Sequence, residues 1–225
     1  MEQTVKRRSL GRPRKETVQD IDSEILDAAQ ALFAAQGFAA TTIDTLVAKL
    51  QVSKHTVYRR YPDKIALLDA VANRDTERFR AMLADIQAQE TPALDRLERA
   101  ARAYFDYGCV AGNAVFYLVA NAEAAHSEEI RERLIRWAAR ALEPLLALVN
   151  EAIAGKELAA GDPESAGAIL VDLLEGAVTR VRHADTLIGG TTVADVFNLR
   201  WRTFLAAFGQ RGKPPSRRRL ASDGA

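Results

Sequence analysis

The most chemically distinctive stretch of the sequence runs from residue 53 to residue 64 and combines cationic, hydroxyl and aromatic side chains. Eight side chains in it are candidates for contacting DNA: Ser53, Lys54, His55, Thr56, Tyr58, Arg59, Arg60 and Lys64. Arginine and lysine bind guanine edges and phosphates, threonine contacts base edges or a thymine methyl, and tyrosine donates to phosphate. A solvated charged helix face has the same composition, so the apolar pattern around these residues must distinguish the two interpretations.

That apolar pattern predicts two short helices joined by a tight turn. Thr42 can cap the first helix, and we also expect it to contact DNA. One side of this helix is apolar, at Ile43, Leu46, Val47 and Leu50. Ser53 can cap the second helix, in which Val57 and Tyr61 point inward. Two capped helices at this spacing form a helix-turn-helix, which favours insertion of the polar face into a major groove over simple solvation.

These residues also resemble a known family. The segments ILDAAQALFAAQGFAATT and VSKHTVYRRYPDKIALLDAV are similar to the DNA-binding domain of TetR-type transcriptional repressors, whose pattern is VS-x-x-T-L-Y-x-H-F-x-x-K-x-x-L. The similarity covers the first third of the chain. It implies DNA contacts by Thr56, Tyr58, Arg60 and Lys64.

The chain departs from the family pattern at the turn. Leu50-Gln51 stands where the family usually has Ala-Gly, and glutamine adopts a left-handed turn conformation only at a cost in free energy. Arg60 and Tyr61 replace a histidine and a phenylalanine, which are chemically mild changes. We therefore expect a small difference in the angle between the two helices.

Composition limits the remaining possibilities. The chain has 225 residues and a net charge of +1, with cations concentrated near the N-terminus. No apolar run approaches the roughly 20 residues needed to span a bilayer, and no signal peptide precedes the first helix. The single cysteine, Cys109, excludes an internal disulfide framework and favours a reducing compartment. We predict a cytoplasmic protein.

Residues 1–16 are expected to be a disordered basic arm. Arg12 and Arg14 flank Pro13, and arginines in an extended segment can enter a narrow minor groove. A solvated tail that contacts phosphates loosely is the alternative, and the sequence does not separate the two. Residues 210–225 are expected to be a disordered basic tail.

The rest of the sequence predicts an all-α protein. A first helix runs from about Asp20 to Gly37, and the helix-turn-helix DNA-binding domain occupies residues 17–64. A continuous helix from about residue 63 to residue 89 joins it to a larger helical domain for ligand binding and dimerisation, residues 65–209. Further helices are expected at about 93–107, 114–124, 163–187 and 192–208, with a long one that begins after Ser127 and contains Pro144.

Aromatic side chains concentrate in the middle of the chain. Six residues form the predicted ligand pocket: Tyr104, Tyr107, Phe116, Tyr117, Asn121 and Trp137. Aromatic walls with a few polar groups are typical of sites for small, largely apolar ligands. An ordinary packed core is the alternative.

The last two helices have wider apolar faces than one packing partner requires. Six residues form the predicted dimer interface: Leu170, Leu174, Val178, Phe197, Trp201 and Phe204. Two helices from each protomer could form a four-helix interface, as in the TetR-type proteins that the chain resembles. These helices could instead only close the core of a monomer.

Taken together, the sequence predicts a homodimeric repressor that binds a palindromic operator in double-stranded DNA and leaves it when a small-molecule effector binds. The alternative is a dimeric DNA-binding regulator whose C-terminal domain docks a protein and binds no ligand. An enzyme is disfavoured, because His55, His126 and His183 are scattered and Cys109 has no base partner in the sequence. No metal or cofactor is expected, and no membrane association.

Overall fold

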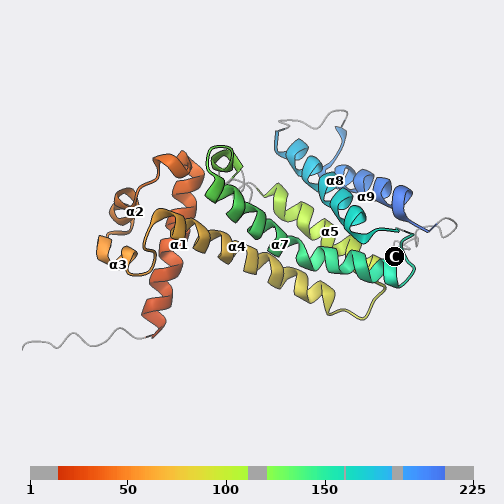
Figure 1. Ribbon diagram of the computed structural model, residues 1–225, viewed down its shortest axis with the longest axis horizontal. Coiled ribbons are helices and arrows are strands. Elements are labelled where there is room, and N and C mark those ends of the chain that lie inside the picture. Colours follow the sequence, from red (N-terminus) through yellow and green to blue (C-terminus); the bar gives the residue numbers. More distant parts are fainter. Residues whose placement is uncertain (1–14, 111–120, 160, 184–189, 211–225) are drawn as a thin grey trace, which may run out of the picture. The chain divides into compact units, whose positions relative to one another are not determined.

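The computed structural model describes residues 15–110, 121–159, 161–183 and 190–210, and their regular structure is helical (Figure 1). The helices are α1 (Lys15–Ala40), α2 (Ile43–Leu50), α3 (Lys54–Tyr58), α4 (Lys64–Gln87), α5 (Ala93–Cys109), α7 (Glu128–Ala154), α8 (Pro163–His183) and α9 (Val193–Phe208). In these ranges the only β-pairing is an isolated bridge between Leu158 and Gly209. The all-α prediction is confirmed. Among the described residues, no helix is both long and apolar enough to cross a membrane.

Several helices begin where the sequence offers a capping side chain. Asp63 Oδ1 accepts a hydrogen bond from the Ala66 amide at 2.6 Å, at the start of α4. Thr192 and Asp195 form a reciprocal capping box before α9, which lowers the pKa of Asp195 through its hydrogen bonds to Thr192. Such caps satisfy amides that have no partner inside the helix.

The first helix differs from its prediction at both ends. It begins at Lys15 instead of near Asp20, and it continues to Ala40 across an interruption at Gly37. Gly37 has φ 82° and ψ 168°, a conformation that an L side chain rarely adopts. Glycine is therefore needed here, although the helix resumes after it.

The chain divides into two compact units, and the first contains the helix-turn-helix. This unit comprises Met1–Asp75 together with Val115–Trp137. Its core includes Phe33, Leu46, Val57 and Leu68, all of them fully buried. The first part of α7 belongs to this core through Ile130 and Trp137. A segment distant in sequence therefore completes the unit that holds the predicted DNA-binding residues.

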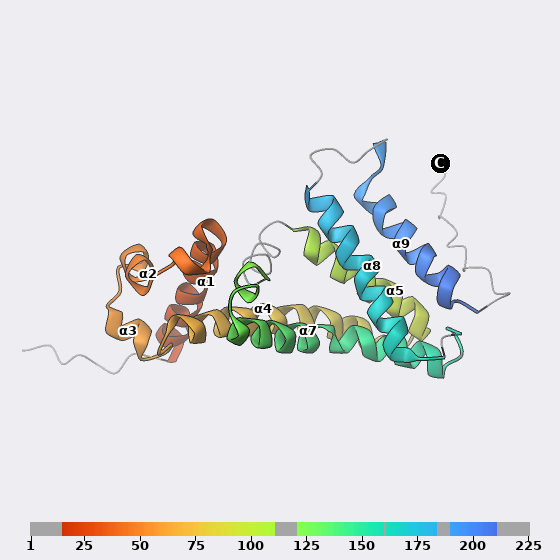
Figure 2. The ribbon, with the colours of Figure 1, turned by 45° about the horizontal axis from the view of Figure 1, so that its top comes forward.

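The second unit, Thr76–Ala114 with Ala138–Ala225, is organised around α5, α8 and α9, which pack against one another (Figure 2). Aromatic rings fill its centre: the ring centroids of Phe105 and Phe197 lie 5.7 Å apart, and those of Trp201 and Phe204 lie 5.5 Å apart. Arg102 adds a cation–π contact, with its guanidinium carbon 4.0 Å from the Phe197 centroid. The second unit therefore has a hydrophobic core of its own.

Candidate nucleic-acid interface

Two side-chain caps and one left-handed residue set the geometry of the helix-turn-helix. Thr42 Oγ1 accepts from the Thr45 amide at 3.1 Å, and Thr45 Oγ1 accepts in return from the Thr42 amide at 3.2 Å. Gln51 ends α2 with φ 56° and ψ 33°, so glutamine does occupy the left-handed position usually given to glycine. Ser53 Oγ then accepts from the Thr56 amide at 3.1 Å and starts α3.

Burial separates the two sides of α3. Val57 is fully buried against Leu46 and other core residues, as the pattern predicts. Tyr61 follows the helix and is half-buried, and burial raises the pKa of its phenol. The short helix is thus held by one buried residue and its cap, and most of its other side chains remain accessible.

The accessible side chains on and around α3 are those predicted to contact DNA. Ser53, Lys54, His55, Tyr58 and Arg59 are exposed, and Thr56 is half-buried. Tyr58 leaves 47% of its surface exposed, so its phenol is accessible to a partner. The cationic, hydroxyl and phenol groups of these side chains could therefore contact a DNA groove at the same time.

Lys54 already has an anionic neighbour. Its Nζ lies 2.7 Å from Asp44 Oδ1 of α2, and the hydrogen bond to Asp44 raises the pKa of Lys54. Both side chains are more than half exposed, so water screens the pair. Binding of Lys54 to a phosphate would require exchanging this carboxylate for the phosphate.

Arg60 and Lys64 contact other residues of the first unit. The Arg60 side chain is only 11% exposed, with its Nε 2.5 Å from Asp22 Oδ1 of α1 and its Nη1 donating to the Thr56 carbonyl. Lys64 Nζ donates to the carbonyls of Phe38 and Ala39 at 2.7 and 3.2 Å, over the Phe38 ring. Arg60 thereby joins α1 to α3, and Lys64 joins α1 to the start of α4. Their contact with DNA stays a prediction.

Other polar contacts hold α1 and α4 together in the same unit. Arg74 Nη1 lies 2.8 Å from Asp27 Oδ1, and its Nη2 donates to Gln30 Oε1 at 2.9 Å. Gln30 in turn donates to Asp75 Oδ2 at 2.6 Å. This network could not be predicted from the sequence, because no local spacing relates α1 to the middle of α4.

The other residues predicted for DNA contact and for the ligand pocket are not gathered in one place. Arg12, Arg14, Phe116 and Tyr117 lie outside the described residues. Of the predicted pocket, Trp137 is 5% exposed in the core of the first unit, whereas Tyr104 and Tyr107 pack on Phe79 in the second. Asn121 is exposed.

The six residues predicted for the dimer interface are all inside the core of their own chain. They are at most 8% exposed: Leu170, Leu174, Val178, Phe197, Trp201 and Phe204. Side chains covered this fully by their own chain present almost no surface to a partner. On the same helices, Ile169 and Leu199 are exposed by 42% and 52%. Neither residue is among the six predicted for the interface.

Metal-ligating and thiol side chains are the remaining groups whose placement bears on chemistry. In the described parts of the chain no three His, Cys, Asp or Glu side chains gather as they would around a metal ion. Cys109 is half-buried, and burial raises the pKa of its thiol, which lowers its reactivity.

Comparison with known proteins places the helix-turn-helix in a family. Residues 25–71 match the model of bacterial regulatory proteins of the tetR family. None of the curated proteins matches the chain in sequence.

Solved structures match nearly the whole chain at low identity. A TetR transcription regulator from Haloarcula marismortui is 22% identical with a TM-score of 0.68, covering 85% of this chain and 100% of that one. A candidate TetR-family regulator from Rhodococcus sp. is 22% identical with a TM-score of 0.68, covering 83% and 98%. A candidate transcriptional regulator from Saccharomonospora viridis, solved with choline, is 17% identical with a TM-score of 0.70, covering 86% and 100%. At these identities the similarity establishes a shared fold.

Proposed function

We propose that the chain is a TetR-type DNA-binding regulator, a homodimeric repressor that a small, largely apolar ligand releases from a palindromic operator. The match of residues 25–71 to the tetR family model and the shared fold support the proposal. The observation that carries the proposal is the capped helix-turn-helix. Its buried Val57 faces the core, and its cationic, hydroxyl and phenol side chains face outward. As a regulator that binds DNA in a bacterial cell, the protein would act in the cytoplasm.

In this proposal the residues in and around α3 divide into three groups. Thr56 and the exposed residues Lys54, His55 and Arg59 read or approach base edges, and Tyr58 donates to phosphate. Thr42 and Ser53 contribute their caps as well as hydroxyl contacts. Arg60 and Lys64 position α3 and the start of α4 through their contacts with α1.

Dimerisation supplies the spacing that DNA requires. Two recognition helices must lie roughly 34 Å apart to enter successive major grooves on one side of the duplex. We propose that the dimer forms through exposed stripes of α8 and α9 next to the buried residues first considered. The stripes comprise the exposed Ile169 and Gly176 with the half-buried Leu173 on α8, and the exposed Leu199, Thr203 and Ala206 on α9.

Small residues in these stripes favour close approach of helices. A Cβ added at Gly176 would meet nothing within 4 Å, so this side of α8 is open. Ile169 and Leu199 provide apolar area on either helix. Burial of such a surface in a four-helix arrangement would stabilise a dimer.

The ligand is proposed to act in the second unit, near the aromatic group of Phe79, Tyr104 and Tyr107. The ring centroid of Phe79 lies 5.7 Å from that of Tyr104 and 5.2 Å from that of Tyr107, and the Tyr104 hydroxyl donates to Glu175 Oε1 of α8 at 3.0 Å. Phe79 belongs to α4, the helix whose first residues lie in the DNA-binding unit. A ligand that favours one conformation of this helix would shift operator affinity through its differential affinity for the two states.

Selection of duplexes from a random pool by the purified full-length protein tests the proposal. A two-fold symmetric product that is retained against random competitor DNA is the expected result. Recovery of no preferred duplex would contradict sequence-specific binding.

The same selection with cell extract tests the ligand. Loss of the duplex on addition of a filtrate of small molecules supports release by a ligand. Loss only with the protein fraction would favour the docking alternative.

A further inference from the structure

A proline inside α7 leaves one backbone acceptor without its normal donor. In an α-helix the amide of residue i+4 donates to the carbonyl of residue i, and Pro144 has no amide hydrogen. The carbonyl of Arg140 therefore lacks this partner within α7. A polar backbone group without a partner is costly wherever it is shielded from water.

A side chain of α4 occupies that carbonyl. Arg80 Nη1 donates to the Arg140 carbonyl at 2.6 Å and also lies 2.6 Å from Glu143 Oε2. The Arg80 side chain is 28% exposed, so the bond is only partly screened by solvent. Charge-assisted hydrogen bonds of this kind are stronger than neutral ones.

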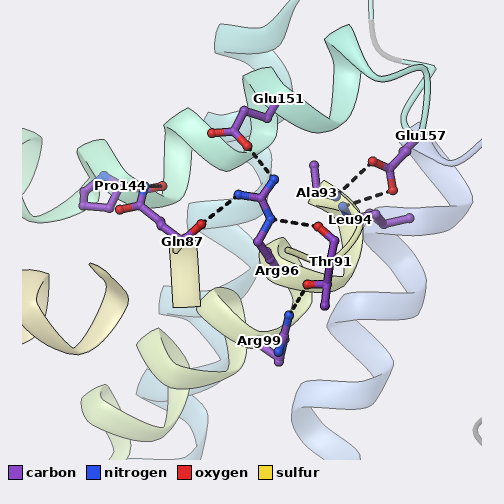
Figure 3. Close-up of polar contacts among 9 residues, drawn as sticks. All are labelled: Gln87, Thr91, Ala93, Leu94, Arg96, Arg99, Pro144, Glu151 and Glu157. Atoms are coloured by element: carbon purple, nitrogen blue, oxygen red, sulfur yellow. Dashed lines mark hydrogen bonds and ion pairs between the residues drawn. The ribbon is translucent and has the colours of Figure 1, made fainter. Parts of the chain in front are cut away.

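Neighbouring residues of α4 reinforce the contact. Glu77 Oε1 lies 2.6 Å from Arg140 Nη2. Gln87 Nε2 donates to the Pro144 carbonyl at 3.2 Å, and Figure 3 labels these two residues. Glu77, Arg80 and Gln87 recur at positions i, i+3 and i+10 and lie on one side of α4. One side of the helix is therefore matched to the segment of α7 around its proline.

The C-terminal end of α4 reaches α7 by a second route. Arg96 of α5 donates from Nη1 to the Gln87 carbonyl at 3.0 Å, and its Nη2 lies 2.7 Å from Glu151 Oε2 of α7 (Figure 3). Both routes lie within the second unit. The Arg80 bond differs from the other contacts, because it depends on the missing amide of Pro144.

We infer that Arg80 is a positioning residue for DNA binding. By donating to the Arg140 carbonyl, which has no helical donor because of Pro144, it holds α4 in the orientation that the operator requires. The inference rests on the proposed function, since α4 begins in the DNA-binding unit and continues into the second unit. In this inference the effect of Arg80 depends on the amide hydrogen that Pro144 lacks.

A double-mutant cycle in urea unfolding of the full-length protein tests the coupling. Arg80→Met should raise the equilibrium constant for unfolding by about tenfold in the natural background, and by less than about threefold in a Pro144→Ala background. The difference arises because an alanine at position 144 supplies the amide hydrogen that Pro144 lacks, so the Arg140 carbonyl no longer depends on Arg80. Equal effects in both backgrounds would overturn the inference and assign the effect to the Glu143 ion pair.

Two further variants keep the cycle interpretable. Glu143→Gln removes the ion pair and leaves the carbonyl bond, so the dependence on residue 144 should persist in it. Arg80→Gln retains an amide donor and serves if the methionine variant does not fold. Persistence of the coupling supports the inference, and its disappearance in Glu143→Gln contradicts it.

Operator affinity separates positioning from stability. At a temperature where all variants are folded, Arg80→Met should weaken binding to the selected duplex about fivefold or more. Leu205→Ala, a half-buried residue of α9 chosen as a destabilised control, should stay within about twofold. Equal weakening by both variants would reduce Arg80 to a structural role. If selection yields no duplex, the proposed function fails, while the cycle still decides the link between Arg80 and Pro144.

Discussion

The helix-turn-helix and the α8–α9 pair differ in which of their side chains are buried and which are exposed. The recognition helix α3 has five residues, of which Val57 alone is buried, and it is started by the side chain of Ser53. The helices α8 and α9 have 21 and 16 residues and bury their large aromatic and aliphatic side chains within their own chain. A short capped helix leaves its polar side chains exposed for contacts with a partner, whereas long helices held by packing bury their apolar side chains within the chain.

This contrast indicates where function can be sought. Where local hydrogen bonds hold an element, its remaining side chains are free to recognise a partner. Where burial holds it, the conspicuous apolar residues stabilise the fold, and a partner must bind the less conspicuous ones beside them.

The largest expected effect is on stability in the second unit. Phe197→Ala removes a fully buried ring that contacts Phe105 and Trp201, and should lower the free energy of unfolding by about 3–5 kcal/mol. Arg59→Ala, on the exposed side of the recognition segment, should change it by less than about 0.5 kcal/mol. Urea denaturation measures both. If the Phe197→Ala protein were as stable as the natural protein but monomeric, Phe197 would act in assembly and not in the core. That result would contradict the comparison.

Next in size is the effect on assembly. Ile169→Glu introduces a charge into the proposed dimer stripe at a position that is 42% exposed in the single chain. The dimer dissociation constant should rise at least about tenfold, or about 1.4 kcal/mol, while the helical content stays unchanged. Analytical ultracentrifugation measures the constant. Glu164→Gln, an exposed change at the first turn of α8, is the control that should leave assembly intact.

The caps of the helix-turn-helix come third. Ser53→Ala should cost about 1 kcal/mol of stability, because the Thr56 amide loses the hydroxyl as an acceptor and keeps only the Ser53 carbonyl at 3.0 Å. Ser53→Gly should cost only about 0.3 kcal/mol, since glycine suits a cap position. Thermal unfolding distinguishes the variants. Equal losses from alanine and glycine would indicate that the hydroxyl acts through another contact.

A smaller effect of opposite sign is expected at the turn. Gln51→Gly should raise stability by up to about 1 kcal/mol, because glycine has no Cβ to strain at φ 56°. Gln51→Ala retains the strain and gives the matched control, and chemical denaturation compares the two. A loss of stability with glycine would show that contacts of the glutamine side chain outweigh the backbone strain.

The smallest effect concerns the exposed pair Lys54–Asp44. The pair raises the pKa of Lys54, so its contribution is present at neutral pH and disappears only as pH rises past the titration of the lysine. Asp44→Asn should leave stability near neutral pH almost unchanged, because the pair is exposed. It should strengthen DNA binding slightly by freeing Lys54 for phosphate. Affinity measured over a range of salt concentrations checks this, and weaker binding would indicate that Asp44 orients Lys54 usefully.

Much of the first unit follows from local sequence signals. The caps at Thr42, Ser53 and Asp63 are confirmed, and so is the inward direction of Val57. Each depends on residues within four positions of one another, which is the range over which helix caps and helical periodicity act. The roles assigned to the exposed residues in DNA binding remain proposals.

Long-range partners could not be predicted in the same way. Arg60 pairs with Asp22, and Lys64 donates to the carbonyls of Phe38 and Ala39, across separations of more than 20 residues. Nothing in a cation's own neighbourhood indicates whether it points outward or pairs across the fold. The same holds for Arg80 and the carbonyl freed by Pro144.

The sequence by itself determined the helical class and the helix-turn-helix with its caps, because local hydrogen bonds and helical periodicity act over a few residues. Only the tertiary structure decided which apolar face of α8 and α9 is covered by the chain itself, and which cations remain exposed. Those outcomes depend on segments far apart in sequence that compete for the same buried surface, and no local pattern records the result of that competition.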